Sequence, residues 1–177
     1  MRIPAAVRRK AKKIRLLLLD VDGVLTDGAI VIDDRGIESK RFDVRDGQGI
    51  ALLQRAGIEV GFITGRRSNV VRHRARELGV KLVYQGVRDK ADIYNQIKGK
   101  SGLSDDQIAY AGDDLPDLPV LRQVGLAITV PGAGPILSYA THYVTQAQGG
   151  HGAVREISEL LLKAQSFWQQ AASVYLK

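Results

Sequence analysis

Two aspartates stand two residues apart directly after an apolar segment, in the stretch Leu19-Asp20-Val21-Asp22-Gly23. Carboxylates at the end of a buried strand are costly unless something compensates their charge. A divalent cation is a suitable compensator, because Mg²⁺ prefers carboxylate, carbonyl and water oxygens. Gly23 would let the backbone turn sharply and approach a bound oxyanion. The pair therefore predicts a metal-assisted site for an anionic group.

Further polar side chains that suit phosphoryl chemistry follow later apolar segments. Thr64 supplies a hydroxyl, Lys90 an ammonium group, and three acids follow at Asp113, Asp114 and Asp117. A hydroxyl and an ammonium can hold phosphate oxygens, while a metal shields the ester's charge from an attacking carboxylate. Alone, each residue has an ordinary explanation, such as a helix cap, a surface charge or an acidic helix N-terminus. Their occurrence together, each after its own predicted strand, indicates a phosphoryl-transfer site.

The predicted elements bring these residues to one edge of a sheet. Strands are expected at residues 14–21, 60–64, 81–84, 108–111, 126–130 and 143–144, and helices at 49–57, 68–78, 90–97 and 117–124. This alternation implies right-handed crossovers and a mostly parallel sheet covered by helices on both faces. Active sites in such folds gather at the carboxyl ends of the strands, which is where the polar residues lie.

Three segments fall outside the alternation. Ile30–Ile32 and Ile37–Phe42 flank turn-forming residues and predict a β-hairpin. A glycine-rich loop opens residues 149–177, in which apolar residues at helical spacing from 153 to about 169 predict an amphipathic closing helix. Residues 1–13 are strongly basic, and we interpret them as a solvated or mobile segment. The whole chain, residues 1–177, is expected to form a single domain.

Composition narrows the function classes. The chain has no cysteine, which excludes disulfides, zinc–thiolate sites and cysteine nucleophiles and agrees with a reducing cytoplasm. No apolar run approaches the roughly 20 residues that span a bilayer, so membrane insertion is not expected. The net charge of +7 suggests either nucleic-acid binding or electrostatic steering of anionic substrates. Because no aromatic residues interleave with the basic N-terminus, a nucleic-acid partner is not expected.

The motifs resemble those of the haloacid dehalogenase-like (HAD) phosphohydrolase superfamily over essentially the whole chain. Its four motifs match Asp20-Val21-Asp22-Gly23, Thr64, Lys90, and Gly112-Asp113-Asp114 with Asp117. The resemblance implies a three-layer, Rossmann-like α/β fold. It also implies that Asp20 is the nucleophile and Asp22 the general acid and base, with Thr64 and Lys90 completing the catalytic set.

The same resemblance implies a Mg²⁺ cofactor. Its ligands would be Asp20, the backbone carbonyl of Asp22, and Asp113, with waters completing the shell. Asp114 and Asp117 would orient Lys90 or metal-bound water. The stretches from Asp20 to Thr64 and from Thr64 to Lys90 are too short for a folded cap domain, so a capless enzyme with a protruding hairpin is expected.

Further strings narrow the resemblance to the 3-deoxy-D-manno-octulosonate (KDO) 8-phosphate phosphatase family. They are Phe42–Ile50, Ile63–Arg66, Tyr84–Gly86 and Gly149–Glu156. The resemblance implies a cytoplasmic homotetramer that hydrolyses KDO 8-phosphate in lipopolysaccharide biosynthesis, with a tail that helps to cover an adjacent active site. It implies substrate contacts at Asp22, Asp43, Val44, Arg45, Asp46, Gly47, Arg66, Arg74 and Lys90.

Three alternatives stay open. A related capless phosphatase acting on a nonulosonate 9-phosphate or another sugar phosphate would share most of these strings. A noncatalytic oligomeric binding subunit would keep the fold alone, and the complete set of Asp20, Asp22, Thr64, Lys90 and Asp113 argues against it. Nucleic-acid binding through the N-terminus would give a steeply salt-dependent affinity that is lost on truncation before Ile14.

Overall fold

A six-stranded parallel sheet forms the centre of the computed structural model, which describes residues 3–175 apart from the side chain of Val174. Its strands are β1 (Leu16–Leu19), β4 (Glu59–Thr64), β5 (Leu82–Gln85), β6 (Ile108–Ala111), β7 (Leu126–Thr129) and β8 (Tyr143–Val144). The order is β5-β4-β1-β6-β7-β8, and every pairing is parallel. After β1 the chain adds β4 and β5 on one side of it, and then returns to add β6, β7 and β8 on the other side. The carboxyl ends of β4, β1 and β6 are therefore neighbours.

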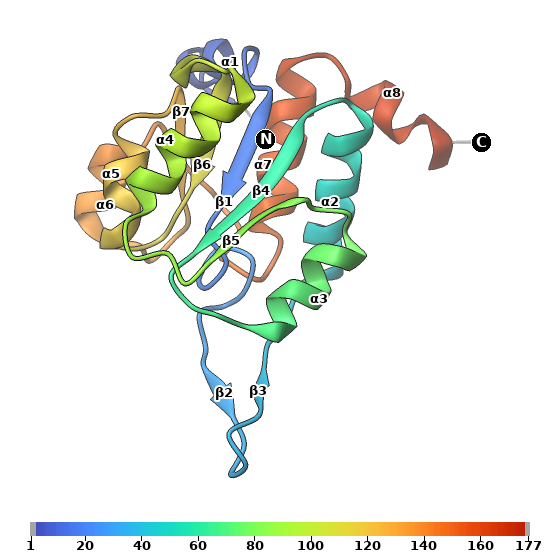
Figure 1. Ribbon diagram of the computed structural model, residues 1–177. Coiled ribbons are helices and arrows are strands. Elements are labelled where there is room, and N and C mark those ends of the chain that lie inside the picture. Colours follow the sequence, from blue (N-terminus) through green and yellow to red (C-terminus); the bar gives the residue numbers. More distant parts are fainter. Residues whose placement is uncertain (1–2, 176–177) are drawn as a thin grey trace.

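Helices cover both faces of this sheet (Figure 1). One face carries α1 (Ala5–Ala11), α2 (Val44–Arg55), α3 (Asn69–Glu77), α7 (Ala153–Ala164) and α8 (Trp168–Ala172), and the other carries α4 (Lys90–Ser101), α5 (Leu118–Leu121) and α6 (Gly134–Ala140). Alternate leucines of β1 serve the two cores, with Leu17 and Leu19 in one and Leu16 and Leu18 in the other. The predicted three-layer α/β fold is confirmed.

A two-stranded antiparallel hairpin, β2 (Val31–Ile32) and β3 (Glu38–Ser39), projects beyond the carboxyl ends of the sheet (Figure 1). The Asp33 carboxylate closes its tip by accepting the N–H groups of Arg35 and Ile37. The predicted hairpin is confirmed. In the described chain no further folded unit is inserted between β1 and β4 or between β4 and β5, which agrees with the capless architecture.

Helix α2 begins at Val44, five residues before the predicted start at Gly49. Asp43 caps it, because its carboxylate accepts the N–H of Arg45 at 2.7 Å. Two glycines lie inside the helix for reasons of space. A Cβ on Gly47 would lie 2.4 Å from the guanidinium of Arg74, and one on Gly49 would lie 2.8 Å from Ser158 Oγ. The glycines therefore allow α2 to pack closely against α3 and α7.

The closing helix is shorter than predicted. It ends as α7 and resumes as α8, because Ser166 adopts a φ of 63° and the Phe167 N–H bonds the Leu162 carbonyl at 2.8 Å, a common helix-terminating pattern. The predicted helix at 117–124 is a 3₁₀ turn at Leu115–Asp117 followed by the short α5. Two further 3₁₀ turns lie at Asp105–Gln107 and Ser173–Tyr175. Helix α6 was not predicted.

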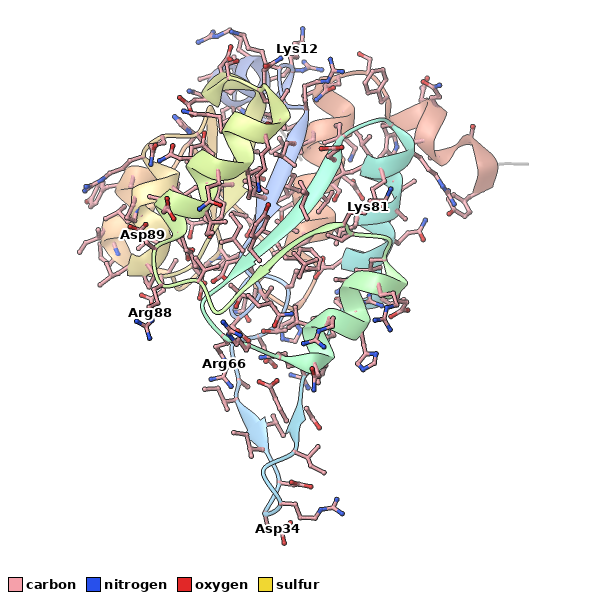
Figure 2. All side chains as sticks on the ribbon, in the orientation of Figure 1. Lys12, Asp34, Arg66, Lys81, Arg88 and Asp89 are labelled. Atoms are coloured by element: carbon pink, nitrogen blue, oxygen red, sulfur yellow. The ribbon has the colours of Figure 1, made fainter. Side chains whose placement is uncertain are left out.

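The basic N-terminus is an ordered helix where the structure describes it, although Arg8, Arg9, Lys12 and Lys13 are exposed to solvent as predicted. It forms α1, whose Val7 and Ala11 are buried in the same core as α7, and Lys10 donates to the Gly125 carbonyl at 2.9 Å. Lys12 lies at the end of the molecule opposite Arg66 and the hairpin tip (Figure 2). The segment's charges are therefore remote from the carboxyl ends of the strands. None of the helices described has the length and apolarity needed to cross a bilayer.

Candidate active site

Asp20 stands at the carboxyl end of β1, and Lys90 approaches it from the start of α4. The Asp20 N–H continues the pairing with β6 by donating to the Ala111 carbonyl at 2.9 Å, and Asp20 as a whole is only 7% exposed. The Lys90 Nζ lies 3.0 Å from Asp20 Oδ1 and 2.6 Å from Asp117 Oδ1. Asp89 caps α4 through the N–H groups that follow Lys90, so the lysine enters the site from a fixed helix end.

Asp117 is completely buried and uses both carboxylate oxygens within the protein. Its Oδ1 accepts from Lys90 and from the hydroxyl of Tyr110. Its Oδ2 accepts the N–H groups of Asp113 at 3.0 Å and Asp114 at 3.2 Å. Asp117 therefore fixes both the Lys90 ammonium and the loop that carries the two preceding acids.

Asp113 is the acid of this loop whose carboxylate can still accept a ligand. Its Oδ1 is buried and has no hydrogen-bond partner among the described residues, whereas Asp114 is exposed and accepts the N–H of Leu115. Carboxylate oxygens of Asp20, Asp113 and Asp117 lie within 4.8 Å of one another. Because Asp117 is already engaged, Asp20 and Asp113 are the carboxylates that can accept a cation, and such hard oxygen donors fit Mg²⁺.

The absence of a side chain at Gly23 leaves room for the carboxylate of Asp113. The glycine adopts a φ of +93°, and an added Cβ would lie 1.9 Å from Asp113 Oδ2. The loop that carries Gly23 is covered by the glycine-rich segment, because a Cβ on Gly149 would lie 1.7 Å from the Gly23 carbonyl oxygen and Gly150 donates to the Val24 carbonyl. Backbone at Gly23 thus lies directly against Asp113, and the glycine-rich segment lies directly against the Gly23 loop.

The electrostatics of the cluster follow from burial and crowding. Burial raises the pKa of Asp20 to about 6, although Lys90 opposes the shift. Burial, with repulsion from Asp20 and Asp117, raises the pKa of Asp113 to about 7. For Lys90 burial acts to lower the pKa, but the two adjacent carboxylates outweigh it and raise the pKa above its ordinary value. One ammonium therefore faces three carboxylates, and added positive charge would stabilise the cluster.

Asp22 lies within a second charged group at the base of the hairpin. Its Oδ1 accepts from the Nζ of Lys40, and its Oδ2 lies 4.0 Å from Arg66 Nε. Glu38 joins the two cations, at 3.3 Å from Lys40 Nζ and 3.0 Å from Arg66 Nη2. Thr64 ends β4 next to this group, and its buried hydroxyl accepts the Arg66 N–H at 3.3 Å.

The predicted substrate residues at the start of α2 have their contacts outside the Asp20 cluster. Asp43 and Arg45 pair with each other at 2.6 Å, and Arg45 also donates to the His151 carbonyl in the glycine-rich segment. Val44 beside them is 79% exposed. Arg45 therefore contacts the glycine-rich segment, where a Cβ on Gly152 would lie 3.4 Å from its Nη2.

Asp46 and Arg74 are engaged in packing between helices. The buried Asp46 carboxylate accepts the N–H groups of Gly152 and Arg155 at the start of α7, and burial raises its pKa to about 6. Arg74 packs over Gly47 and pairs with Glu77 at 2.9 Å. The structure does not direct the Asp46 carboxylate toward a substrate, since its two oxygens are used to cap a helix.

Sequence reasoning missed Glu38, Lys40 and Tyr110. Glu38 and Lys40 stand two apart in the predicted second hairpin segment and therefore share a face, which was an available signal. Tyr110 is the only polar side chain in a predicted buried strand, so a hydrogen-bonding partner was to be expected. Which partner each residue contacts could not be derived from local pattern.

No family model matches the chain. The 3-deoxy-D-manno-octulosonate 8-phosphate phosphatase KdsC of Yersinia pestis is 47% identical over 159 residues, which cover 90% of this chain and 85% of the relative. The chain belongs to the KDO 8-phosphate phosphatase family.

Solved structures place this family in the HAD superfamily. A protein from Legionella pneumophila, described as a HAD superfamily (subfamily III A) hydrolase, matches with a TM-score of 0.94 and 47% identity over 97% of this chain and 94% of that one. The KDO 8-phosphate phosphatase of Moraxella catarrhalis, solved with a magnesium ion, a phosphate ion and a KDO molecule, matches with a TM-score of 0.93 and 41% identity over 96% and 97%.

Proposed function

We propose that this chain is a magnesium-dependent phosphatase that hydrolyses KDO 8-phosphate to KDO and phosphate in the cytoplasm, within lipopolysaccharide biosynthesis. The observation that carries the proposal is Lys90 held between Asp20 and Asp117, beside an Asp113 oxygen that is buried without a hydrogen-bond partner among the described residues. The choice of substrate is supported by the name of the Yersinia pestis relative and by the KDO in the Moraxella catarrhalis structure.

In the proposed reaction Asp20 attacks the phosphorus atom in line with the departing ester oxygen. As the phosphorus–oxygen bond breaks, Asp22 gives that oxygen a proton, and the phosphoryl group is held as an acyl phosphate on Asp20. Asp22 then takes a proton from the water that attacks the same phosphorus, which releases phosphate and restores the Asp20 carboxylate. The Thr64 hydroxyl and the Lys90 ammonium hold the nonbridging oxygens through both steps.

Mg²⁺ would be held by Asp20, the backbone carbonyl of Asp22, and Asp113. When bound it supplies positive charge that reduces repulsion between the Asp20 carboxylate and the phosphate ester. Asp117 keeps Lys90 aimed at Asp20, and together with Asp114 it fixes the loop that presents Asp113.

The substrate is an acid as well as a phosphate ester, so it needs cations besides Lys90. Arg66 is the best placed, because its Nε is buried without a hydrogen-bond partner among the described residues while its Nη2 is held by Glu38. Arg45 is largely exposed and available at the edge of the glycine-rich segment. Asp43, Val44, Asp46 and Gly47 would contribute mainly by shaping α2 and holding that segment, and Arg74 by holding α3.

A phosphate-release panel tests the proposal. It compares KDO 8-phosphate, nonulosonate 9-phosphates, hexose phosphates and nucleotides, with Mg²⁺ and after chelation by EDTA. We expect KDO 8-phosphate to be preferred, chelation to stop turnover, and Asp20→Asn to eliminate it. A preference for a nonulosonate 9-phosphate would move the assignment to the alternative sugar acid. Undiminished turnover by Asp20→Asn would remove the nucleophile.

We further propose assembly as a homotetramer through the hairpin. Ile30, Val31, Ile32 and Ile37 are each more than half exposed, which is unusual for a cluster of apolar side chains on a free surface. Ile32→Asp should therefore reduce the mass measured by light scattering after size exclusion. Ile136→Asp, at an equally exposed isoleucine of α6, is the matched control. A tetrameric Ile32→Asp protein would exclude the hairpin from the interface.

A further inference from the structure

The side chain of Lys40 is almost completely buried at the base of the hairpin. Only 1% of it is exposed, and its Nζ contacts the carboxylates of Asp22 and Glu38. Burying an ammonium group is unfavourable unless it is paired and hydrogen-bonded, so this geometry is held by its two partners. Lys40 follows β3 directly, whereas Asp22 follows β1. The contact therefore ties the hairpin to the loop of the catalytic aspartates.

Glu38 completes the arrangement from within β3. Hydrogen bonds from Ser68, and then from Arg66 and Lys40, hold the pKa of Glu38 below its ordinary value, so the side chain is an anion. Ser68 is the cap of α3, and Arg66 lies two residues after the end of β4 in the loop that leads to that cap. Glu38 thus connects the hairpin to the loop between β4 and α3, a second part of the site.

The four side chains form a balanced group of two anions and two cations. Without Glu38, Lys40 and Arg66 would both be drawn to Asp22, the one remaining anion of the four. With Glu38 present, Arg66 Nη2 is held 3.0 Å away on Glu38, and Lys40 engages Asp22 through Oδ1. The second oxygen of Asp22 lies 4.0 Å from Arg66 Nε, beyond hydrogen-bond distance, and is left available.

We propose that Lys40 and Glu38 form a latch through which the hairpin positions Asp22 for proton transfer. The inference rests on the proposed function, in which Asp22 is the general acid and base. Lys40 is a positioning residue: it fixes one oxygen of Asp22 so that the other faces the ester oxygen and, later, the attacking water. Glu38 keeps Lys40 and Arg66 in separate places. Because the latch lies at the root of the hairpin, a partner that orders the hairpin would also order Asp22.

The test separates proton transfer from attack by Asp20. KDO 8-phosphate has a sugar alkoxide leaving group that needs a proton, whereas p-nitrophenyl phosphate has a leaving group that departs as a stable anion. In Lys40→Met, turnover of KDO 8-phosphate should fall about 10- to 100-fold with KM little changed, since misplacement of an acid–base group has effects of this size. With p-nitrophenyl phosphate, the first-turnover burst reports attack by Asp20 and should keep its rate. The steady-state rate that follows includes hydrolysis of the acyl phosphate, which needs Asp22, and should fall.

Three comparisons complete the experiment. Asp22→Asn should show the same pattern in a stronger form, and Lys40→Arg should recover most of the activity. Lys98→Met is the matched control, because it removes a Lys–Asp pair, with Asp105, that touches none of these residues. A Lys40→Met protein that matches Lys98→Met, or one that loses the burst and the sugar-phosphate activity equally, would overturn the latch. An inactive wild-type protein would instead overturn the proposed function.

Glu38→Gln provides a second test that does not depend on the folding of Lys40→Met. It keeps the side-chain volume and removes the charge that holds Arg66 and Lys40 apart. Turnover of KDO 8-phosphate should fall several-fold with the p-nitrophenolate burst retained, and KM for KDO 8-phosphate should rise because Arg66 is released. Kinetic constants equal to those of the wild type would show that Glu38 positions neither residue, and the latch would be rejected.

Discussion

Replacing Asp113 with asparagine should stabilise the metal-free protein while it removes metal-dependent activity. The carboxylate lies beside Asp20 and Asp117, and its Oδ1 has no hydrogen-bond partner among the described residues. In the absence of a cation the ionised group is therefore both poorly solvated and repelled. An amide keeps the shape and removes the charge, so the unfavourable interaction is lost on substitution.

The size of the effect follows from the pKa of Asp113, about 7 against an ordinary value of 3.8. At about 1.4 kcal/mol for each pKa unit, ionisation near neutral pH lowers the stability of the folded state by at most about 4 kcal/mol. Asp113 is partly exposed and water screens its charge, so we expect about 1–2 kcal/mol, or about 3–6 °C in melting temperature. The penalty grows as pH rises from about 4 to 7 and disappears as pH falls back through that range.

Thermal unfolding with and without Mg²⁺ at pH 7.5 and 5 measures this effect. Without metal, Asp113→Asn should melt above the wild type at pH 7.5, and the gap should shrink at pH 5. Saturating Mg²⁺ should raise the wild type and leave the variant almost unchanged, because only a protein that binds the ion is stabilised by it. Asp114→Asn, at the exposed neighbouring acid, is the control and should shift little. A metal-free variant less stable than the wild type, or one stabilised equally by Mg²⁺, would refute the reasoning.

Two further predictions concern the same loop. The apparent affinity for Mg²⁺, measured by calorimetry, should increase as pH rises from 5.5 to 8. Asp20 and Asp113 have pKa values of about 6 and 7, and each must lose its proton before it binds the ion. A pH-independent affinity would contradict the assignment of these two residues as ligands. Gly149→Ala should reduce turnover at least about 10-fold, since its Cβ would collide with the Gly23 carbonyl and displace the loop. Gly99→Ala, where a Cβ meets nothing within 4 Å, should leave turnover unchanged, and equal rates in the two variants would count against the collision.

The alternation of strands and helices along the chain, and the sheet edge that carries the site, could be predicted from local pattern. Three apolar segments, which form β1, β4 and β6, end at or shortly before a polar residue with phosphoryl chemistry, and a parallel sheet brings carboxyl ends together whatever the details of packing. The position of Asp20, Thr64 and Asp113 at the site therefore follows from the predicted strand that each one ends or follows. Lys90 is similar, because Asp89 provides a recognisable cap that places the lysine at the first turn of α4.

Features that depend on contacts between distant segments could not be predicted. Gly47 and Gly49 resemble helix-breaking residues in the sequence, yet both lie inside α2 because neighbouring helices occupy the space where side chains would be. The basic residues near α1 concealed the apolar pair Val7 and Ala11, which packs in the same core as α7. Asp46 lies in a family string, but its partners are N–H groups of residues more than one hundred positions away.

The two charged groups differ in a way that bears on their roles. The Asp22 group balances two anions with two cations, so it needs nothing further and is suited to hold a geometry. The Asp20 group sets Lys90 against three acids and is left negative. Such an imbalance is unfavourable in the isolated fold, and stabilising substitutions at functional sites commonly remove activity for this reason. A bound divalent cation would correct it and would also attract the anionic phosphate ester, whereas a group that was already neutral would gain less from binding the ion.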